Sequence, residues 1–221
     1  MQKGRHFIDE LNDQRNILFA VIGVLVVAGL GYYGYTLWFA KHESKAWQEY
    51  VTADRLPEDK RWTELKKVYG DFRSCRPTFF AALALADHAY DEAKKAATAV
   101  NGDASKSSAE AVEWYDKALQ FADLGPNEKQ LLLVNRGGAN EIAKKYDVSL
   151  ADYRKASEIA GYGKGLALLG MARIYELTKD NQKAVETYNK VASDLADTEF
   201  AKTAKNLLRR LQSPLFKDQN S

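Results

Sequence analysis

A run of 24 residues, from Ile17 to Ala40, carries no charged side chain. As an α-helix it would be roughly 36 Å long, which exceeds the hydrocarbon core of a bilayer, about 30 Å thick. A core helix of a soluble domain would normally show a polar stripe, and this run has none. Its C-terminal third gathers aromatic residues, which prefer the headgroup level of a membrane. These are Tyr32, Tyr33, Tyr35 and Trp38. The sequence therefore predicts a transmembrane helix over 16–40.

A cleaved secretory signal is the alternative for this segment. The apolar part of a signal peptide is about 7–15 residues long and ends in small residues. The run here is longer and closes with Leu37, Trp38 and Phe39, so we expect a retained anchor. The numbers of Lys and Arg residues before and after the run are nearly equal, so charge does not decide which way the helix crosses the membrane. A short polar head over 1–15 and a long folded tail favour a cytoplasmic N-terminus.

Composition argues against several classes of function. The chain has 32 Lys plus Arg and 30 Asp plus Glu, a net charge of +2 with both signs interspersed, which gives no electrostatic footprint for nucleic acid. A single cysteine, Cys75, excludes an internal disulfide. The histidines, His6, His42 and His88, are scattered, and no Cys/His cluster has metal-ligand spacing. No phosphate loop or nucleophile with its base is recognisable, so we expect neither an enzyme nor a cofactor.

The remainder of the chain is predicted to be helical, because its apolar residues recur at helical spacing and no segment alternates with period two for long. We expect a helical linker over 41–75, a repeat domain over 76–212 with a polar loop at 101–108, and a frayed tail over 213–221. The expected helices span 58–72, 78–100, 108–123, 127–145, 148–160, 164–178, 181–195 and 198–212.

A recurring pattern of small, aromatic and small residues indicates how these helices pack. Its copies include Ala111, Tyr115 and Ala118; Ser149, Tyr153 and Ala156; and Ala184, Tyr188 and Val191. The spacing resembles the tetratricopeptide repeat (TPR), a helix-turn-helix unit of about 34 residues. Small residues let antiparallel helices approach, and the aromatic ring fills the gap toward the next hairpin. The predicted fold is all-α, a transmembrane helix followed by a TPR-like helical solenoid. The alternative is a generic helical hairpin domain in which the spacing is coincidental.

The resemblance to TPR domains implies a binding groove. In that family the first helix of each hairpin lines a concave groove, often through the second, fifth, ninth and twelfth repeat positions. Carried onto repeats at 130–163 and 165–198, these positions are Leu131, Val134, Gly138, Glu141, Leu166, Leu169, Arg173 and Glu176. The apolar members would form a strip flanked by charge, suited to an extended or helical peptide. Alternatively, neighbouring helices or the 41–72 segment fill the groove.

The order of parts also resembles one family, the ancillary SecYEG translocon subunits of bacterial inner membranes. The matching stretches are Ala46 with Tyr50 after the span, the helix restart at 79–86 and the repeats at 130–198. The resemblance implies a single-pass inner-membrane protein whose periplasmic TPR domain holds or hands over polypeptides near the translocon, with periplasmic chaperones as further partners. A scaffold that docks one folded partner of the cell-envelope or division machinery is the alternative. Binding of many unfolded chains would favour the first, and one stoichiometric partner the second.

Overall fold

The computed structural model describes the backbone of residues 2–213 and the side chains of Arg15 and of residues 17–213. Over this part of the chain the structure is entirely helical. The expected frayed tail, apart from Ser213, lies outside the described residues. The helices are α1 (Gln2–Asp54), α2 (Glu58–Asp71), α3 (Arg76–Thr98), α4 (Ser105–Leu119), α5 (Pro126–Ile142), α6 (Tyr146–Glu158), α7 (Gly163–Leu177), α8 (Asn181–Asp194) and α9 (Glu199–Gln212).

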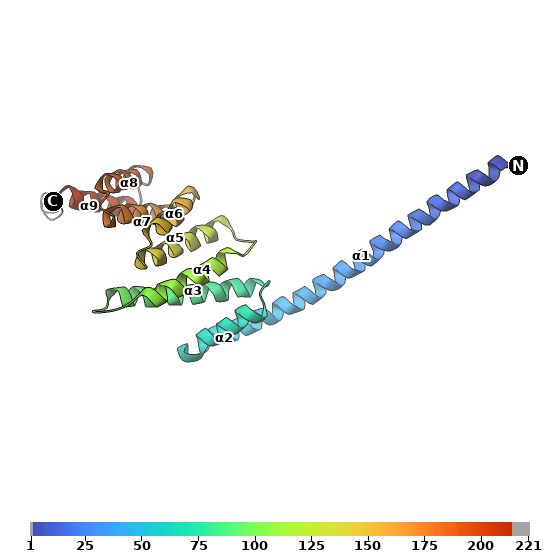
Figure 1. Ribbon diagram of the computed structural model, residues 1–221, viewed down its shortest axis with the longest axis horizontal. Coiled ribbons are helices and arrows are strands. Elements are labelled where there is room, and N and C mark those ends of the chain that lie inside the picture. Colours follow the sequence, from blue (N-terminus) through green and yellow to red (C-terminus); the bar gives the residue numbers. More distant parts are fainter. Residues whose placement is uncertain (1, 214–221) are drawn as a thin grey trace.

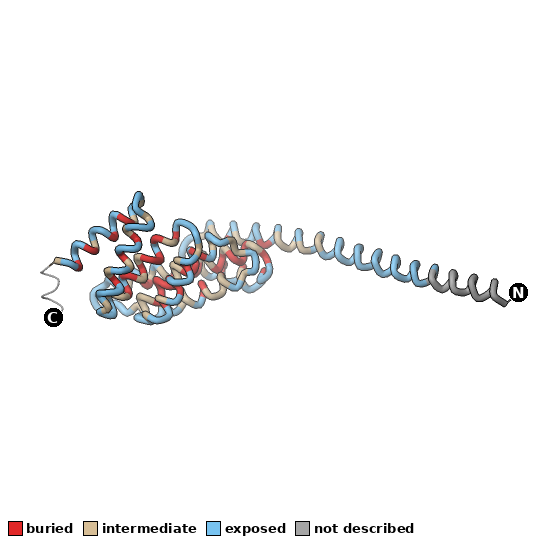
Figure 2. Tube along the Cα trace, turned by 90° about the horizontal axis from the view of Figure 1, so that it is seen from above, coloured by how far each residue is buried: buried red, intermediate tan, exposed pale blue. Residues whose placement is uncertain are grey.

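Helix α1 projects from the rest of the molecule as a single rod (Figure 1). It contains the uncharged run and continues without a break into the segment that was expected to link span and domain. Every residue from 17 to 35 is exposed, because no other helix lies beside this part of α1 (Figure 2). Within the described residues, it is the one helix long and apolar enough to cross a membrane. Such a contiguous apolar surface is unfavourable in water, and a lipid environment removes that cost.

The helices after α1 form a solenoid of antiparallel pairs (Figure 1). Each helix contacts the next one along the chain. Each odd-numbered helix also contacts the next odd-numbered helix, whereas the even-numbered helices do not contact one another. The stack therefore curves toward its odd-numbered layer, which forms the inner face. This arrangement confirms the predicted all-α solenoid.

The small and aromatic residues of the repeat pattern pack as predicted. All nine residues of the three quoted copies are buried. Tyr153 of α6 lies between two glycines of neighbouring odd-numbered helices. A Cβ atom added to Gly137 of α5 would lie 2.9 Å from its ring, and one added to Gly170 of α7 would lie 2.6 Å from it. The ring thus fills the gap toward the next hairpin, and glycine is what lets the helices approach.

Three of the expected helix boundaries are off by three or four residues: the end of α5, the start of α4, and the end of α4, which lies at Leu119 and not at 123. Helix α5 ends at Ile142 and not at 145, because Lys144 adopts a positive φ of 58° and the Lys145 N–H bonds back to Asn140 O. The equivalent turn after α7 has Lys179 at φ 62°. Helix α4 begins at Ser105, inside the expected loop, where the Asp103 carboxylate accepts the Ser105 N–H at 2.9 Å.

Candidate functional site

The eight groove positions lie on α5 and α7, in the inner layer of the solenoid. Leu131 and Leu166 keep 45% and 36% of their surface exposed. Val134 and Leu169 are half-buried against the cores beneath them. Gly138 is buried, and a Cβ added there would lie 2.1 Å from the Tyr90 hydroxyl, so the tyrosine occupies the space beside it. The exposed parts of Leu131, Val134, Leu166 and Leu169 are called here the apolar strip.

The segment 41–72 does not cover this strip. Helices α1 and α2 contact each other and α3, but neither contacts α5 or α7. The interpretation in which this segment fills the groove is therefore wrong. It packs instead at the start of the solenoid, where Leu65 and Val68 of α2 join a core with Phe79 of α3.

The charged groove positions are bound to other residues of the chain. The Arg173 side chain donates two hydrogen bonds to the Glu141 carboxylate, from Nε to Oε1 at 2.5 Å and from an Nη atom to Oε2 at 2.7 Å. The Tyr153 hydroxyl donates to the same carboxylate at 3.0 Å. Only 13% of the Glu141 side chain is exposed, compared with 52% for Arg173. A carboxylate of α5, a tyrosine of α6 and an arginine of α7 thus join three consecutive helices.

The same arrangement recurs one repeat later. The Tyr188 hydroxyl of α8 donates to Glu176 of α7 at 2.5 Å, and Arg210 of α9 donates to the second oxygen of that carboxylate. An earlier copy has neutral donors only. There the Tyr115 hydroxyl of α4 donates to Asp87 of α3 at 2.6 Å, and the Asn135 amide of α5 lies 3.5 Å from the same oxygen. We call these groups the three carboxylate–tyrosine clusters.

Burial sets the protonation states of these clusters. It raises the pKa of Tyr115, Tyr153 and Tyr188 well above the ordinary value, and the adjacent carboxylates raise it further. Burial also raises the pKa of Asp87. The hydrogen bonds to Glu141 raise the pKa of Arg173, so that it stays charged. At neutral pH the phenols therefore remain protonated and donate to the carboxylates, and each cluster connects neighbouring helices.

Sequence reasoning placed the three tyrosines in the repeat pattern but missed six members of these clusters as parts of the site. These are Asp87, Tyr115, Asn135, Tyr153, Tyr188 and Arg210. A signal was present in the chain. Glu141 and Glu176 each precede their tyrosine by 12 residues. When a charged residue and a buried aromatic residue recur at the same sequence spacing, the two side chains are expected to contact each other in each repeat.

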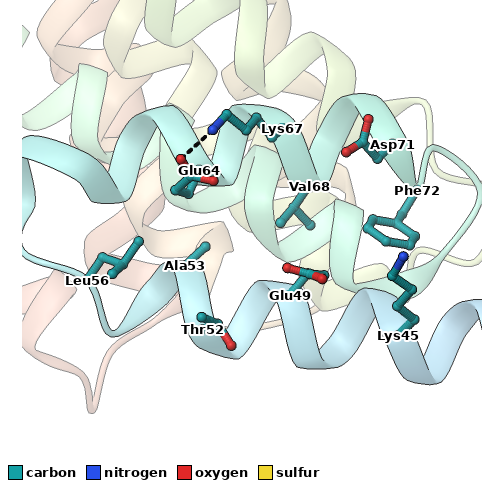
Figure 3. Close-up of a pocket in the computed structure, with 10 residues that line it drawn as sticks. All are labelled: Lys45, Glu49, Thr52, Ala53, Leu56, Glu64, Lys67, Val68, Asp71 and Phe72. Atoms are coloured by element: carbon teal, nitrogen blue, oxygen red, sulfur yellow. Dashed lines mark hydrogen bonds and ion pairs between the residues drawn. The ribbon is translucent and has the colours of Figure 1, made fainter.

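A mixed-charge cleft of about 260 Å³ lies between α1 and α2 (Figure 3). Ala53 and Val68 line it together with two lysines and three carboxylates, Lys45, Lys67, Glu49, Glu64 and Asp71. Lys67 pairs with Glu64 at 2.5 Å. Across the described residues, no three His, Cys, Asp or Glu side chains come together in a way that could hold a metal ion. The cleft therefore offers a surface of mixed charge with one carboxylate in excess, and the apolar strip remains the stronger candidate.

Comparison of the chain with protein-family models, curated proteins and solved structures finds no match.

Proposed function

We propose that this protein is a membrane-anchored helical-repeat module that captures polypeptide segments at the bacterial inner membrane and so assists protein translocation or hand-over to periplasmic chaperones. Helix α1 anchors it through residues 17–40, with the solenoid on the periplasmic side. It acts by reversible binding, without a chemical step or cofactor. The resemblance to TPR-containing ancillary translocon subunits supplies the biological setting for this proposal.

The observation that carries the proposal is the apolar strip on the inner face. Leu131 and Leu166 are exposed at equivalent positions of consecutive repeats. Full burial of one leucine side chain contributes about 1.5–3 kcal/mol, so covering the exposed halves of two leucines contributes roughly 2 kcal/mol. Binding of this size needs further contacts along a peptide and stays weak, which suits transient capture of unfolded chains.

The carboxylate–tyrosine clusters support the same proposal. Glu141, Arg173 and Glu176 flank the strip but are bound within the chain, so they present few unmatched charges to a ligand. A surface of this kind selects for apolar side chains and is tolerant of the ligand's charge pattern. That property fits many polypeptides better than one folded, charge-complementary partner.

Crosslinking in intact membranes tests this proposal. A photoreactive amino acid at Leu131 or Leu166 should capture a broad range of secreted polypeptides. The same group at Val148, which is 51% exposed on the even-numbered helix α6, is the matched control and should capture far fewer. Leu131→Asp should reduce capture by a probe at Leu166. A single crosslinked band of fixed stoichiometry would favour a scaffold, and equal labelling at Val148 would contradict the groove.

The orientation has a separate test. One reporter enzyme works only outside the cytoplasm. Fused after Ser221, it should show activity. Activity of a cytosol-specific reporter at the same position would contradict the periplasmic placement.

A further inference from the structure

The end of the apolar run and the first loop of the solenoid are joined by stacked rings. Trp38 and His42 of α1 are parallel, with ring centroids 5.1 Å apart and an interplanar angle of 9°. The His42 ring lies 5.0 Å from that of Phe72, which follows α2. The α2–α3 loop, residues 72–75, is therefore held against α1 at the aromatic end of the apolar run. In a membrane-spanning helix that end lies at headgroup depth.

Arg73 lies in this loop and faces the same region. It lines a cleft of about 330 Å³ together with Tyr35, Trp38 and Phe39 of α1. Its side chain is exposed and forms no ion pair with any residue that the structure describes. The neighbouring basic residues differ, since Arg76 pairs with Glu128 and Lys117 pairs with Glu113 at 2.7 Å. Arg73 is thus an exposed arginine that forms no ion pair with a described residue, placed beside the aromatic end of the apolar run.

A second cleft, of about 620 Å³, extends from this point toward the α4–α5 loop. It shares Phe39, Arg73 and Ser74 with the first cleft and adds Arg76 and Lys117. Asp71 lines the first cleft, and Glu43 and Asp123 line the second. Both loops lie at the helix ends that point back toward the exposed part of α1 (Figure 1). The surface that faces the bilayer therefore carries two hollows with arginine at their shared border.

We propose that Arg73 binds the phosphate of an anionic phospholipid headgroup in these hollows and so seats the solenoid on the membrane surface. The inference rests on α1 spanning a membrane, as proposed above. A guanidinium matches phosphate geometry through two parallel N–H donors. A basic residue at an anionic membrane surface strengthens association by about fivefold. The aromatic wall of Tyr35 and Trp38 accommodates the glycerol end of the lipid, at the level where such rings are most stable.

Lipid selectivity of the full-length protein tests the proposal. The protein is reconstituted in vesicles of phosphatidylcholine with about one third phosphatidylglycerol, and the association of spin-labelled phosphatidylglycerol and phosphatidylcholine is compared by electron paramagnetic resonance. The wild-type protein should favour the anionic lipid several-fold. Arg73→Gln should lower that preference by about fivefold, and Arg73→Lys should retain most of it. The matched control is Arg154→Gln, an exposed arginine of α6 on another face of the solenoid, which should leave the preference unchanged.

Two further measurements separate the outcomes. Inorganic phosphate should not compete with the lipid, because the site uses the bilayer to place the phosphate, and full competition would overturn the lipid assignment. Equal lipid preference in wild-type protein and Arg73→Gln would overturn it as well. Flotation of the reconstituted protein with the vesicles is scored in parallel. Flotation without selectivity would contradict only the lipid site, whereas failure to float would overturn the membrane anchor and the lipid site together.

Discussion

Arg173 of α7 holds Glu141 of α5 through two hydrogen bonds, although the two residues are 32 positions apart in the chain. Both were expected to face a ligand. Their pairing joins two consecutive hairpins on the inner face of the solenoid, with Tyr153 as a third partner. A repeat protein is stabilised mainly by contacts between neighbouring repeats, so such a pair contributes to the cooperativity of the whole stack.

Arg173→Met should therefore destabilise the protein by about 1–3 kcal/mol, because it leaves the largely buried Glu141 carboxylate with only the tyrosine as a donor. Urea unfolding of the full-length protein in detergent, followed by circular dichroism, measures the change. Arg154→Met is the control and should shift stability by no more than about 0.5 kcal/mol. In a double-mutant cycle, Glu141→Gln combined with Arg173→Met should cost less than the sum of the single changes. Additive losses would show that the pair is not coupled.

Gly170→Ala should destabilise the protein by about 1–3 kcal/mol, despite a gain in helix propensity of about 1 kcal/mol. The new Cβ would lie 2.6 Å from Cζ of Tyr153 and must push the buried ring against Gly137. The control is Gly70→Ala in α2, where no atom lies within 4 Å of an added Cβ, and it should be neutral or stabilising. A thermal unfolding midpoint that stays unchanged in Gly170→Ala would contradict close packing at this contact.

Arg136→Met should be more damaging, with a loss of about 3–5 kcal/mol. The Arg136 guanidinium donates two hydrogen bonds to Asp152, at 2.9 and 2.5 Å, and only 3% of the Asp152 side chain is exposed. Removal of the arginine leaves a buried carboxylate without its cation. Replacing both residues, as Arg136→Met with Asp152→Leu, should restore much of the stability, since no charge then remains buried. Equal unfolding free energies for the single and double variants would argue against this account.

Stability should fall steeply above about pH 10. The pKa of Tyr115, Tyr153 and Tyr188 is raised by burial in the folded protein, whereas each phenol in the unfolded chain titrates near 10.0. Above that value the unfolded state binds fewer protons, so the free energy of unfolding declines with pH by up to about 1.4 kcal/mol per unit for each tyrosine. Urea midpoints measured between about pH 9 and about pH 11 check this.

Tyr153→Phe is the matched variant for the pH experiment. It should be less stable at neutral pH, because Glu141 loses a donor, but its stability should decline less steeply in alkali. A slope identical to that of the wild-type protein would contradict the assignment of Tyr153 to this transition.

The sequence was sufficient for the fold because the repeat signal lies in residues that pack with their near neighbours. Ser149, Tyr153 and Ala156 lie on one helix, and their spacing alone places them on its buried face. The ends of α4 and α5 were harder to predict from the sequence. They depend on the Asp103 side chain and on a positive φ at Lys144, and neither changes the periodic pattern of apolar residues.

At the candidate groove positions, the exposure of the leucines was predictable, whereas the contacts of the charged residues were not. Leu131 and Leu166 are exposed on the inner face, where a repeat register puts them. The charged positions were expected to flank a ligand. The residues that they contact instead depend on which helices pack together and on how far the helices are shifted along their axes. Glu176 and Arg210, for example, meet only because α9 packs against α7. Local patterns do not contain that information.

The continuity of α1 has a mechanical consequence. Because the helix runs unbroken from Gln2 to Asp54 and α2 and α3 pack directly on its last turns, no hinge separates the anchor from the first hairpin. If α1 spans a membrane as proposed, the solenoid is held at one height and orientation above the lipid surface, and rotation of α1 about its own axis turns the inner face with it. In the proposed function, polypeptides would then have to reach the inner face by diffusion, within a radius set by the length of the stack.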